Sequence, residues 1–196
     1  MSEPLSRLNG DLQPDTLTGR WYSLVPLQPK YYSAIFSLSL RDENNFRWRY
    51  RGTVPSPASF EQSLFAGVMT QFVVVPKDNP ERLAGLVVAY NASPQDSYCY
   101  LAAVMDPKEG AGSTESVALF VRYLFRHWPL RKLYLESAEY NARQYASAAT
   151  TGLLVEEGRL KNHSYFNDRY WDHIIFALYR DAAATYESRF SSIFLD

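Results

Sequence analysis

Two glycines separated by one residue stand between an apolar segment and a helical pattern. Gly110 and Gly112 follow Tyr98–Met105, whose β-branched and aromatic residues predict a buried strand. After the glycines, apolar residues recur every three or four positions from Val117 to Trp128, as on one face of an α-helix. A strand entering a helix through glycines gathers backbone N–H groups at the positive end of the helix dipole. The segment therefore predicts an anion site, most simply for phosphate, although a tight turn shows the same pattern.

The composition limits the classes of protein that this chain can belong to. At 196 residues, of which 46% are hydrophobic, the chain can bury a sizeable core and is expected to form one domain. Twenty Lys and Arg residues against 21 Asp and Glu give a net charge of -1, so neither a nucleic-acid partner nor a polybasic membrane contact is expected. No segment matches a signal peptide or a membrane-spanning helix, which favours a cytoplasmic location.

Cysteine and histidine spacing predicts no metal site. Cys99 is the single cysteine, which excludes an internal disulfide, and it is expected to pack as a small apolar residue rather than act as a nucleophile. His127, His163 and His173 do not have the spacing of metal ligands. His163 could face a substrate, but a structural role is the simpler expectation for it.

The remaining chain supplies the elements that must position the glycine segment. Residues 1–18 are expected to be a loose lead-in, 19–180 a domain, and 181–196 a tail forming a short helix or a partner contact. Further strands are predicted at residues 19–27, 70–76, 82–90, 131–137, 153–161 and 174–180. Further helices are predicted at 29–40, 59–69 and 139–150, and a polar and aromatic loop at 162–173. The strands from 70 to 105 suggest an antiparallel meander, after which the helix must form a crossover.

Four segments, taken together, resemble the GCN5-related N-acetyltransferase (GNAT) family, and most closely its branch of ribosomal-protein alanine acetyltransferases. They are Val104–Pro107, Glu109–Glu115, Glu139–Asn141, and Glu156–Leu160 followed by Arg169–Asp172. The resemblance implies an α+β fold, an α/β sandwich. Its mixed, mostly antiparallel sheet would have about seven strands, splayed between strands 4 and 5, and about four flanking helices.

The resemblance also implies a co-substrate, acetyl-CoA or another acyl-CoA, and the residues that hold it. A backbone N–H near Val104 or Met105 would polarise the thioester carbonyl, as in an oxyanion hole. Asn141 would contact the cofactor, although asparagine is also a good helix cap. The implied pyrophosphate loop consists of Lys108, Glu109, Gly110, Ala111, Gly112, Ser113 and Thr114.

The chain departs from the family pattern at several positions. Its loop is one residue shorter, because Thr114 directly follows Ser113 where a further glycine is usual. Glu109 stands where Gln or Arg is usual, and a carboxylate repels a pyrophosphate unless it points away. Ala148 replaces the tyrosine that acts as a general acid in many relatives, and Gln144 replaces a serine of the ribosomal branch.

Four other side chains are therefore candidates for proton transfer. Tyr145 and Ser147 could protonate a departing thiolate, although Tyr145 is expected first of all to pack against the sheet. Glu136 and Glu139 could accept the proton of an amine through water, or they could be ordinary solvated carboxylates.

The expected function is that of an N-acyltransferase acting on a primary amine of a small molecule or a peptide N-terminus. An aromatic segment, with Tyr31, Tyr32, Phe46, Trp48 and Tyr50, favours an apolar or aromatic acceptor over a polycation. Two alternatives remain open: an acyl carrier protein could be the acyl donor, or the chain could be a silent CoA-binding module. A homodimer is also left open.

Overall fold

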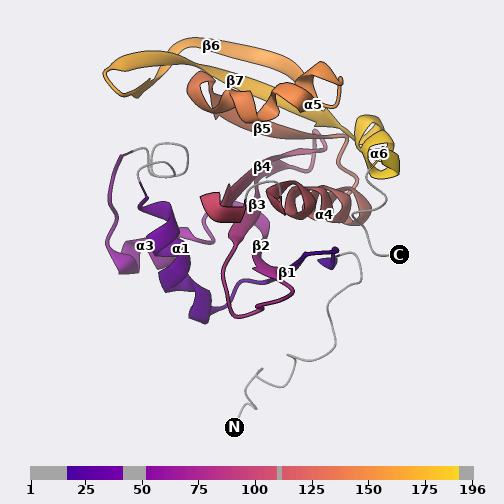
Figure 1. The fold of residues 1–196 in the computed structure, drawn as a ribbon. Helices are drawn as coiled ribbons and strands as arrows, with labels where there is room; N and C mark the ends of the chain where they lie inside the picture. Colours follow the sequence, from indigo (N-terminus) through magenta and orange to yellow (C-terminus); the bar gives the residue numbers. More distant parts are fainter. Residues whose placement is uncertain (1–16, 42–51, 110–111, 190–196) are drawn as a thin grey trace.

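The computed structural model describes residues 17–41, 52–109 and 112–189, which form a sheet with helices on both faces (Figure 1). Seven strands lie in the order β1-β2-β3-β4-β5-β7-β6. Their bounds are Tyr22–Pro26 (β1), Val68–Pro76 (β2), Gly85–Ser93 (β3), Tyr98–Met105 (β4), Lys132–Ala138 (β5), Val155–Phe166 (β6) and Arg169–Tyr179 (β7). The α-helices are Tyr32–Ser39 (α1), Pro57–Ser63 (α3), Gly112–His127 (α4), Ala146–Thr150 (α5) and Arg180–Arg189 (α6). Short 3₁₀ helices are Pro29–Tyr31 (η3), Pro107–Glu109 (η4) and Glu139–Tyr145 (η5).

The sheet is antiparallel except at one place. Strands β4 and β5 are parallel, and α4 makes the crossover between them. The mixed, mostly antiparallel sheet expected from the sequence is confirmed, as are the meander β2-β3-β4 and the helix that follows it.

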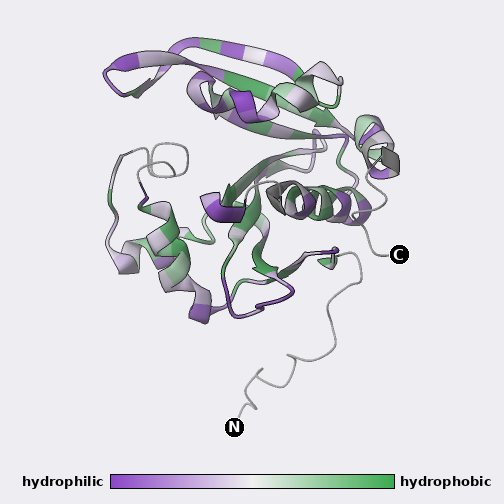
Figure 2. Ribbon diagram, viewed as in Figure 1, coloured by the Kyte–Doolittle hydropathy of each residue, from purple (hydrophilic) through white to green (hydrophobic). Residues whose placement is uncertain are grey.

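The larger core lies between the sheet and α4. Leu119, Phe120 and Leu124 of this helix are fully buried, and Cys99 and Leu101 of β4 belong to the same cluster. Figure 2 shows that the central strands are mainly apolar. Burying a leucine or phenylalanine side chain is worth about 1.5–3 kcal/mol, so this helix is a main source of stability.

A smaller core lies on the opposite face, beneath α1 and α3. Ile35 and Phe60 of these helices pack with Val73 of β2 and Leu86 of β3. This second layer covers the β1–β3 side of the sheet, and its cluster contains no residue of β4, β5 or β7 among the described positions.

Glu115, in the first turn of α4, ties this helix to the first strand. Its residue is only 1% exposed, and its carboxylate accepts hydrogen bonds from the backbone N–H groups of Arg20 (2.6 Å), Trp21 (3.0 Å) and Tyr22 (2.8 Å). A Cβ on Gly19 would come within 2.7 Å of Glu115 Cδ, so the chain needs glycine there. The contact fixes where α4 begins.

The helix predicted at residues 59–69 is correct only in its first half. Ser56 caps α3 by accepting from Ser59 N at 3.2 Å, and the helix ends at Ser63. The chain then turns through Gly67, whose φ is +68°, and β2 begins at Val68. Apolar residues continue at helical spacing from α3 into the start of β2, so the sequence pattern gave no sign of the turn between them.

The loop predicted at residues 162–173 is wrong. Strands β6 and β7 continue through this region and form a long hairpin, joined by Asn167 (φ 52°) and Asp168 (φ 57°). Two adjacent residues with positive φ are typical of a type I′ turn, which suits the twist of a hairpin. Most of β6 is exposed at the edge of the sheet, so its polar sequence lacks the alternation of a half-buried strand.

The short helix expected after residue 180 is present as α6. Ala183 is buried in the larger core, and Glu187 lies 3.7 Å from Arg122 of α4. The helical segment predicted at 139–150 is also present, as η5 followed by α5, and Gly152 ends it with φ +74°. The limits of the domain itself stay a prediction.

We expect Glu115→Ala to lower the free energy of unfolding by about 3 kcal/mol, because it leaves three backbone N–H groups, one of them buried, without their acceptor. Glu115→Gln keeps one acceptor oxygen and should lose about half as much. Urea denaturation monitored by circular dichroism measures both values.

Glu61→Ala is the control, because Glu61 is exposed on α3 and its removal should change stability by less than about 0.5 kcal/mol. A loss for Glu115→Ala no larger than that of the control would contradict the structural role given to Glu115.

Candidate functional site

The sheet opens between β4 and β5. These strands are paired only at Tyr98–Lys132, Cys99–Leu133 and Tyr100–Tyr134. Beyond Tyr100 and Tyr134 the register between the two strands ends, although β4 continues beside β3 to Met105 and β5 continues beside β7 to Ala138. The splay expected between the fourth and fifth strands is therefore confirmed.

The registers on either side show which backbone groups face this opening. Asp106 N donates to Ala84 O at 2.8 Å. Because backbone bonding alternates along an antiparallel pair, the N–H and C=O groups of Val104 face β3, whereas those of Ala103 and Met105 point away from β3. On the other side Arg180 N donates to Arg131 O at 3.0 Å. By the same alternation, the backbone N–H and C=O groups of Glu136 and Ala138 point away from β7.

The opening is thus lined on both sides by backbone donors and acceptors of the described strands. A buried backbone polar group needs a partner, and an extended ligand with amide groups can provide one as an added strand would. The sequence left Val104 and Met105 as equal candidates, and the register favours the Met105 N–H as the donor that faces a ligand.

Helix α4 begins at Gly112, immediately beyond the end of β4 and η4. Its first turn contains Thr114, which is exposed, and its dipole gives that end a positive potential. Lys108 is exposed in η4, and its backbone N–H donates to Asp106 Oδ1 at 3.1 Å. Gly110 and Ala111 lie outside the described residues, as does the side chain of Ser113.

Glu109, in η4, is bonded to two side chains from other parts of the chain. Its side chain is only 4% exposed; it accepts from the Tyr22 hydroxyl at 2.7 Å and forms an ion pair with Arg82. The Arg82 guanidinium lowers the pKa of Glu109, the Tyr22 hydroxyl lowers it further, and burial opposes both. Burial and the hydrogen bond to Glu109 raise the pKa of Tyr22 to about 12. The charge that departs from the family motif is therefore neutralised internally.

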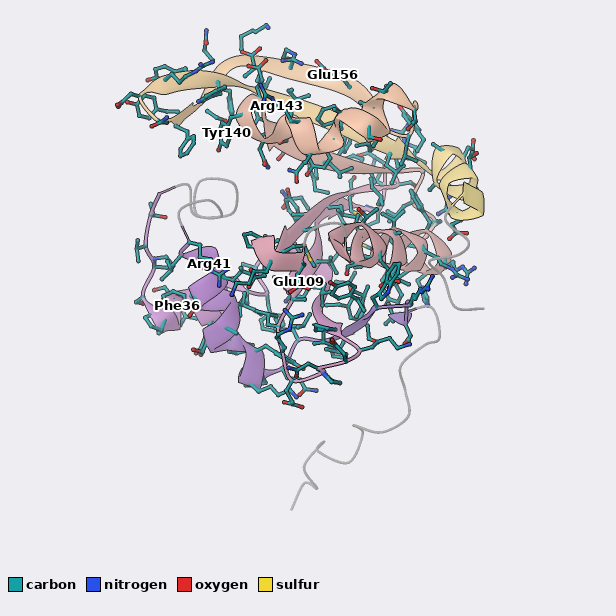
Figure 3. All side chains as sticks on the ribbon, viewed as in Figure 1. Phe36, Arg41, Glu109, Tyr140, Arg143 and Glu156 are labelled. Carbon is teal, nitrogen blue, oxygen red and sulfur yellow. The ribbon has the colours of Figure 1, made fainter. Side chains whose placement is uncertain are left out.

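A second ion pair holds the end of β4. Arg41, just beyond α1, lies 3.0 Å from Asp106 Oδ1. Burial raises the pKa of Asp106, but the Lys108 N–H and the Arg41 guanidinium outweigh it and leave the pKa below its usual value. Figure 3 shows Arg41 and Glu109 on one side of the opening and Tyr140 and Arg143 on the other.

The candidates for proton transfer fall into different environments. Tyr145 packs against Phe176 with ring centroids 5.6 Å apart, and burial raises its pKa. Ser147 is exposed on α5, and Glu139 is a half-exposed partner of Arg159 at 3.4 Å. Tyr145 therefore packs against the sheet. Among the interactions of the described residues, none joins the side chain of Ser147 or Glu139 to β4 or β5.

Glu136 lies on β5 two residues past the last paired position. Its Oε2 is 3.9 Å from Nε2 of His173, which is buried on β7, and the His163 ring lies 5.2 Å from the His173 ring. Of the four candidates, Glu136 is the one placed at the opening. Sequence reasoning gave His173 no role, because β6 and β7 were not expected to be paired there.

Asn141 is half-buried in η5, three residues after β5 ends. This puts it beyond the mouth of the opening on the β5 side, and its contact with a ligand stays a prediction. Cys99 is buried and burial raises its pKa to about 11, as an unreactive thiol requires. The described residues contain no group of His, Cys, Asp and Glu that could hold a metal ion.

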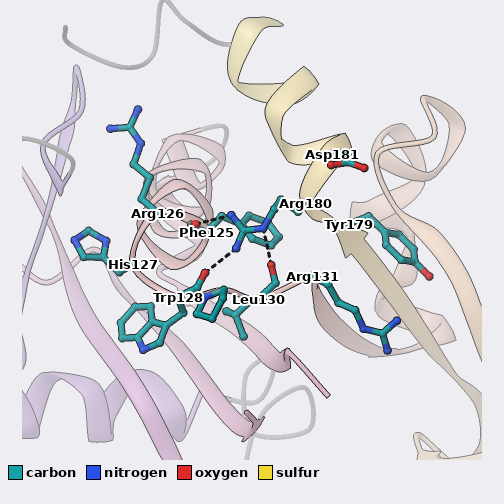
Figure 4. A pocket seen from close by; sticks show the side chains of 10 residues that line it. Phe125, Arg126, His127, Trp128, Leu130, Arg131, Tyr179, Arg180 and Asp181 are labelled. Carbon is teal, nitrogen blue, oxygen red and sulfur yellow. Dashed lines mark hydrogen bonds between the residues drawn. The ribbon is translucent and has the colours of Figure 1, made fainter. Parts of the chain in front are cut away.

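A separate pocket of about 670 Å³ lies at the far end of α4 (Figure 4). Arg180 fills its floor and donates to the carbonyl oxygens of Phe125 (2.7 Å), Trp128 (2.6 Å) and Leu130 (2.7 Å). These bonds satisfy one carbonyl in the last turn of α4 and two in the segment that follows it, so Arg180 serves to fix the end of the helix. None of the described helices is long and apolar enough to cross a membrane.

No protein-family model matches the sequence, and no curated protein matches it. Solved structures do match the fold. Spermidine N-acetyltransferase from Vibrio cholerae, in complex with CoA and spermine, superposes with a TM-score of 0.69 at 20% identity over 83% of this chain and 98% of its own. A probable GNAT-family acetyltransferase from Chromobacterium violaceum gives 0.67 at 21% identity, covering 93% and 96%. The ribosomal L7/L12 alpha-N-protein acetyltransferase RimL with CoA gives 0.69 at 16% identity, covering 85% and 97%.

Similarity at this level of identity shows the fold. The chain has the GNAT fold that its motifs predicted, with the opening between β4 and β5 and the start of α4 beside it.

We expect Glu109 to stabilise the fold in a pH-dependent way. Because its pKa is lowered by folding, the stabilisation is fully present above the ordinary value of 4.5 and is lost as pH falls through the lower pKa of the folded protein. The difference in unfolding free energy between the wild type and Glu109→Gln should be constant at neutral pH and should shrink below about pH 4.5. Urea denaturation across this pH range measures it.

Glu81→Gln is the matched control. Glu81 is 80% exposed and pairs with Lys30 at the surface, so its removal should change stability little at any pH. A pH-independent difference for Glu109→Gln would contradict the assignment.

Proposed function

We propose that this protein is an N-acyltransferase that moves an acyl group, most simply acetyl, from CoA to a primary amine. The observation that carries the proposal is the opening between β4 and β5, where backbone groups of Met105 and Glu136 point away from their other strands. The pantetheine arm of CoA carries amides and can lie between two such strands as an added strand does.

Other features support the same ligand. The α4 N-terminus lies beyond the end of β4, and its dipole suits a pyrophosphate. The Arg82 and Tyr22 contacts neutralise the Glu109 charge, which removes one reason to regard the chain as a silent module. Several structures of the same fold are N-acetyltransferases by name, and two of those described above contain CoA.

In this proposal, acyl-CoA supplies an activated thioester and the chain supplies position and polarity. The Met105 N–H donates to the thioester carbonyl oxygen, which gains negative charge as the amine nitrogen attacks. Glu136 accepts the proton that the amine loses as the C–N bond forms, and the C–S bond then breaks to release the thiolate. Asn141 and Lys108 contact the CoA. No described residue is singled out as the acid for the thiolate.

The finer points of the proposal are the donor, the partners and the location. An acyl carrier protein presents the same pantetheine arm, so the opening would also accept it as a donor. The acceptor is a small-molecule amine or a peptide N-terminus, and we propose a cytoplasmic location. A homodimer is compatible with the exposed edge strand β6.

Acetyl-CoA at about 100 times its dissociation constant should stabilise the protein by roughly 2.7 kcal/mol, which raises Tm by about 5–10 °C. An amine panel should then give thiol release, measured with a chromogenic disulfide. We expect Met105→Pro to keep the Tm shift and lose about 100-fold in kcat, because proline removes only the N–H that faces the opening.

Met105→Leu is the control and keeps both properties, since it changes the side chain but not the backbone donor. An unchanged Tm with acetyl-CoA would disprove the proposal. A Tm shift without thiol release from any amine would indicate a binding module instead.

We also expect Glu136→Gln and Glu139→Gln to differ. Glu136→Gln removes the base beside the opening and should lower kcat by about 100-fold. Glu139→Gln removes only a half-exposed partner of Arg159 and should stay within about twofold of the wild type. Steady-state kinetics from pH 6 to 9 separate the two variants, and equal losses would contradict the assignment of Glu136.

A further inference from the structure

Four tyrosines form a continuous surface at the point where β4 and β5 separate. The ring centroids lie 5.6 Å apart for Tyr90–Tyr100, 6.1 Å for Tyr98–Tyr100, 5.3 Å for Tyr98–Tyr134 and 5.2 Å for Tyr100–Tyr134. All four residues are half-buried. We refer to Tyr90, Tyr98, Tyr100 and Tyr134 as the tyrosine platform.

The platform lies on the face of the sheet opposite α4. Cys99 and Leu101 of β4 enter the core beneath α4, so Tyr98 and Tyr100, which alternate with them, project to the other side. Tyr134 alternates in the same way with buried Leu133 on β5. None of the platform residues belongs to either core cluster of the described residues, so packing of the core does not explain them.

The platform is continuous with the proposed site of acyl transfer. Tyr100 and Tyr134 are the last paired residues of β4 and β5. The next residues on the same face are Ala102, which is small, and Glu136. Glu136 follows Tyr134 by two residues on β5 and so lies beside it on the same face. Burial raises the pKa of Tyr100, and the negative charge of Glu136 raises it further, in agreement with this placement.

One cation, Lys132, already lies against the rings at the end of the platform away from the opening. Lys132 Nζ lies 4.5 Å from the centroid of the Tyr134 ring, and it forms an ion pair with Glu157 at 2.6 Å. The Tyr134 hydroxyl donates to the same carboxylate at 3.0 Å. The charge of Lys132 is therefore balanced by Glu157, and the end of the platform beside the opening carries the Glu136 carboxylate, which lies 3.9 Å from His173.

We propose that the tyrosine platform is the acceptor site and that it takes an arylalkylamine, a primary amine joined by a short alkyl chain to an aromatic ring. The aromatic body stacks on Tyr100 and Tyr98, and the amine reaches Glu136 at the opening. An extended polyamine would need several carboxylates, whereas this surface offers aromatic rings, the Glu136 carboxylate, and a second carboxylate, Glu157, that is already paired with Lys132. The inference rests on the proposed acyl transfer, because it names the acceptor of that same site.

The test compares 2-phenylethylamine with spermidine as acceptors at saturating acetyl-CoA. Wild type should have the higher kcat/KM for 2-phenylethylamine. Tyr100→Leu should raise KM for this amine about 5- to 10-fold, because it removes a ring that stacks, whereas Tyr100→Phe keeps the ring and should stay within about twofold. KM for acetyl-CoA should be unchanged in both variants.

Tyr98→Leu provides a second variant in case Tyr100→Leu does not fold, and the same increase in KM is expected. Tyr165→Leu is the control, because Tyr165 is exposed at the tip of the β6–β7 hairpin and pairs only with Tyr170 among the rings described. It should leave KM unchanged.

Two results would overturn the acceptor assignment while leaving acyl transfer intact. One is a preference for spermidine in the wild type; the other is an unchanged KM in the leucine variants together with a change from dimer to monomer by light scattering, which would make the platform an interface. The absence of a Tm shift with acetyl-CoA would instead disprove the proposed function itself.

Discussion

The architecture depends on the pairing of β4 and β5, each of which is hydrogen-bonded mainly to the strand on its outer side. Strand β4 is paired with β3 from Tyr98 to Met105 with one irregularity near its start, and β5 is paired with β7 along its whole length. The two strands meet each other only from Tyr98 to Tyr100 and from Lys132 to Tyr134. Each strand is therefore held by a longer ladder on its outer side. The sheet behaves as two half-sheets joined at one short parallel contact, and the opening needs no loop or insertion to create it.

Each half-sheet has its own attachment to α4. Glu115 binds the start of the helix to the backbone at and just before the first residue of β1, and the Arg180 guanidinium binds the end of the helix to the beginning of α6. The helix therefore packs across both halves, and its first turn lies beyond the end of β4. A crossover that buries Leu119 and Leu124 completely cannot shift without loss of core contacts.

The sequence predicted best those features that depend on local spacing. The strand at 98–105 and the helix that follows were predictable because side-chain period and proline positions agree there. The turn at Asn167 and Asp168 was missed, because these residues interrupt a polar edge strand that has no buried face. The partners of Glu109 were missed because Arg82 and Tyr22 lie 27 and 87 residues away in the chain. Charge compensation over such separations leaves no local signal.

Gly85 on β3 is paired with Met105, the last residue of β4. A Cβ at this position would lie 2.5 Å from Val104 O and would collide with Met105 Sδ, so the methionine side chain occupies the space that a larger residue would fill. Any substitution there would have to displace either the Met105 side chain or the end of β4. The position of the last residue of β4 therefore depends on the absence of a side chain on the neighbouring strand β3.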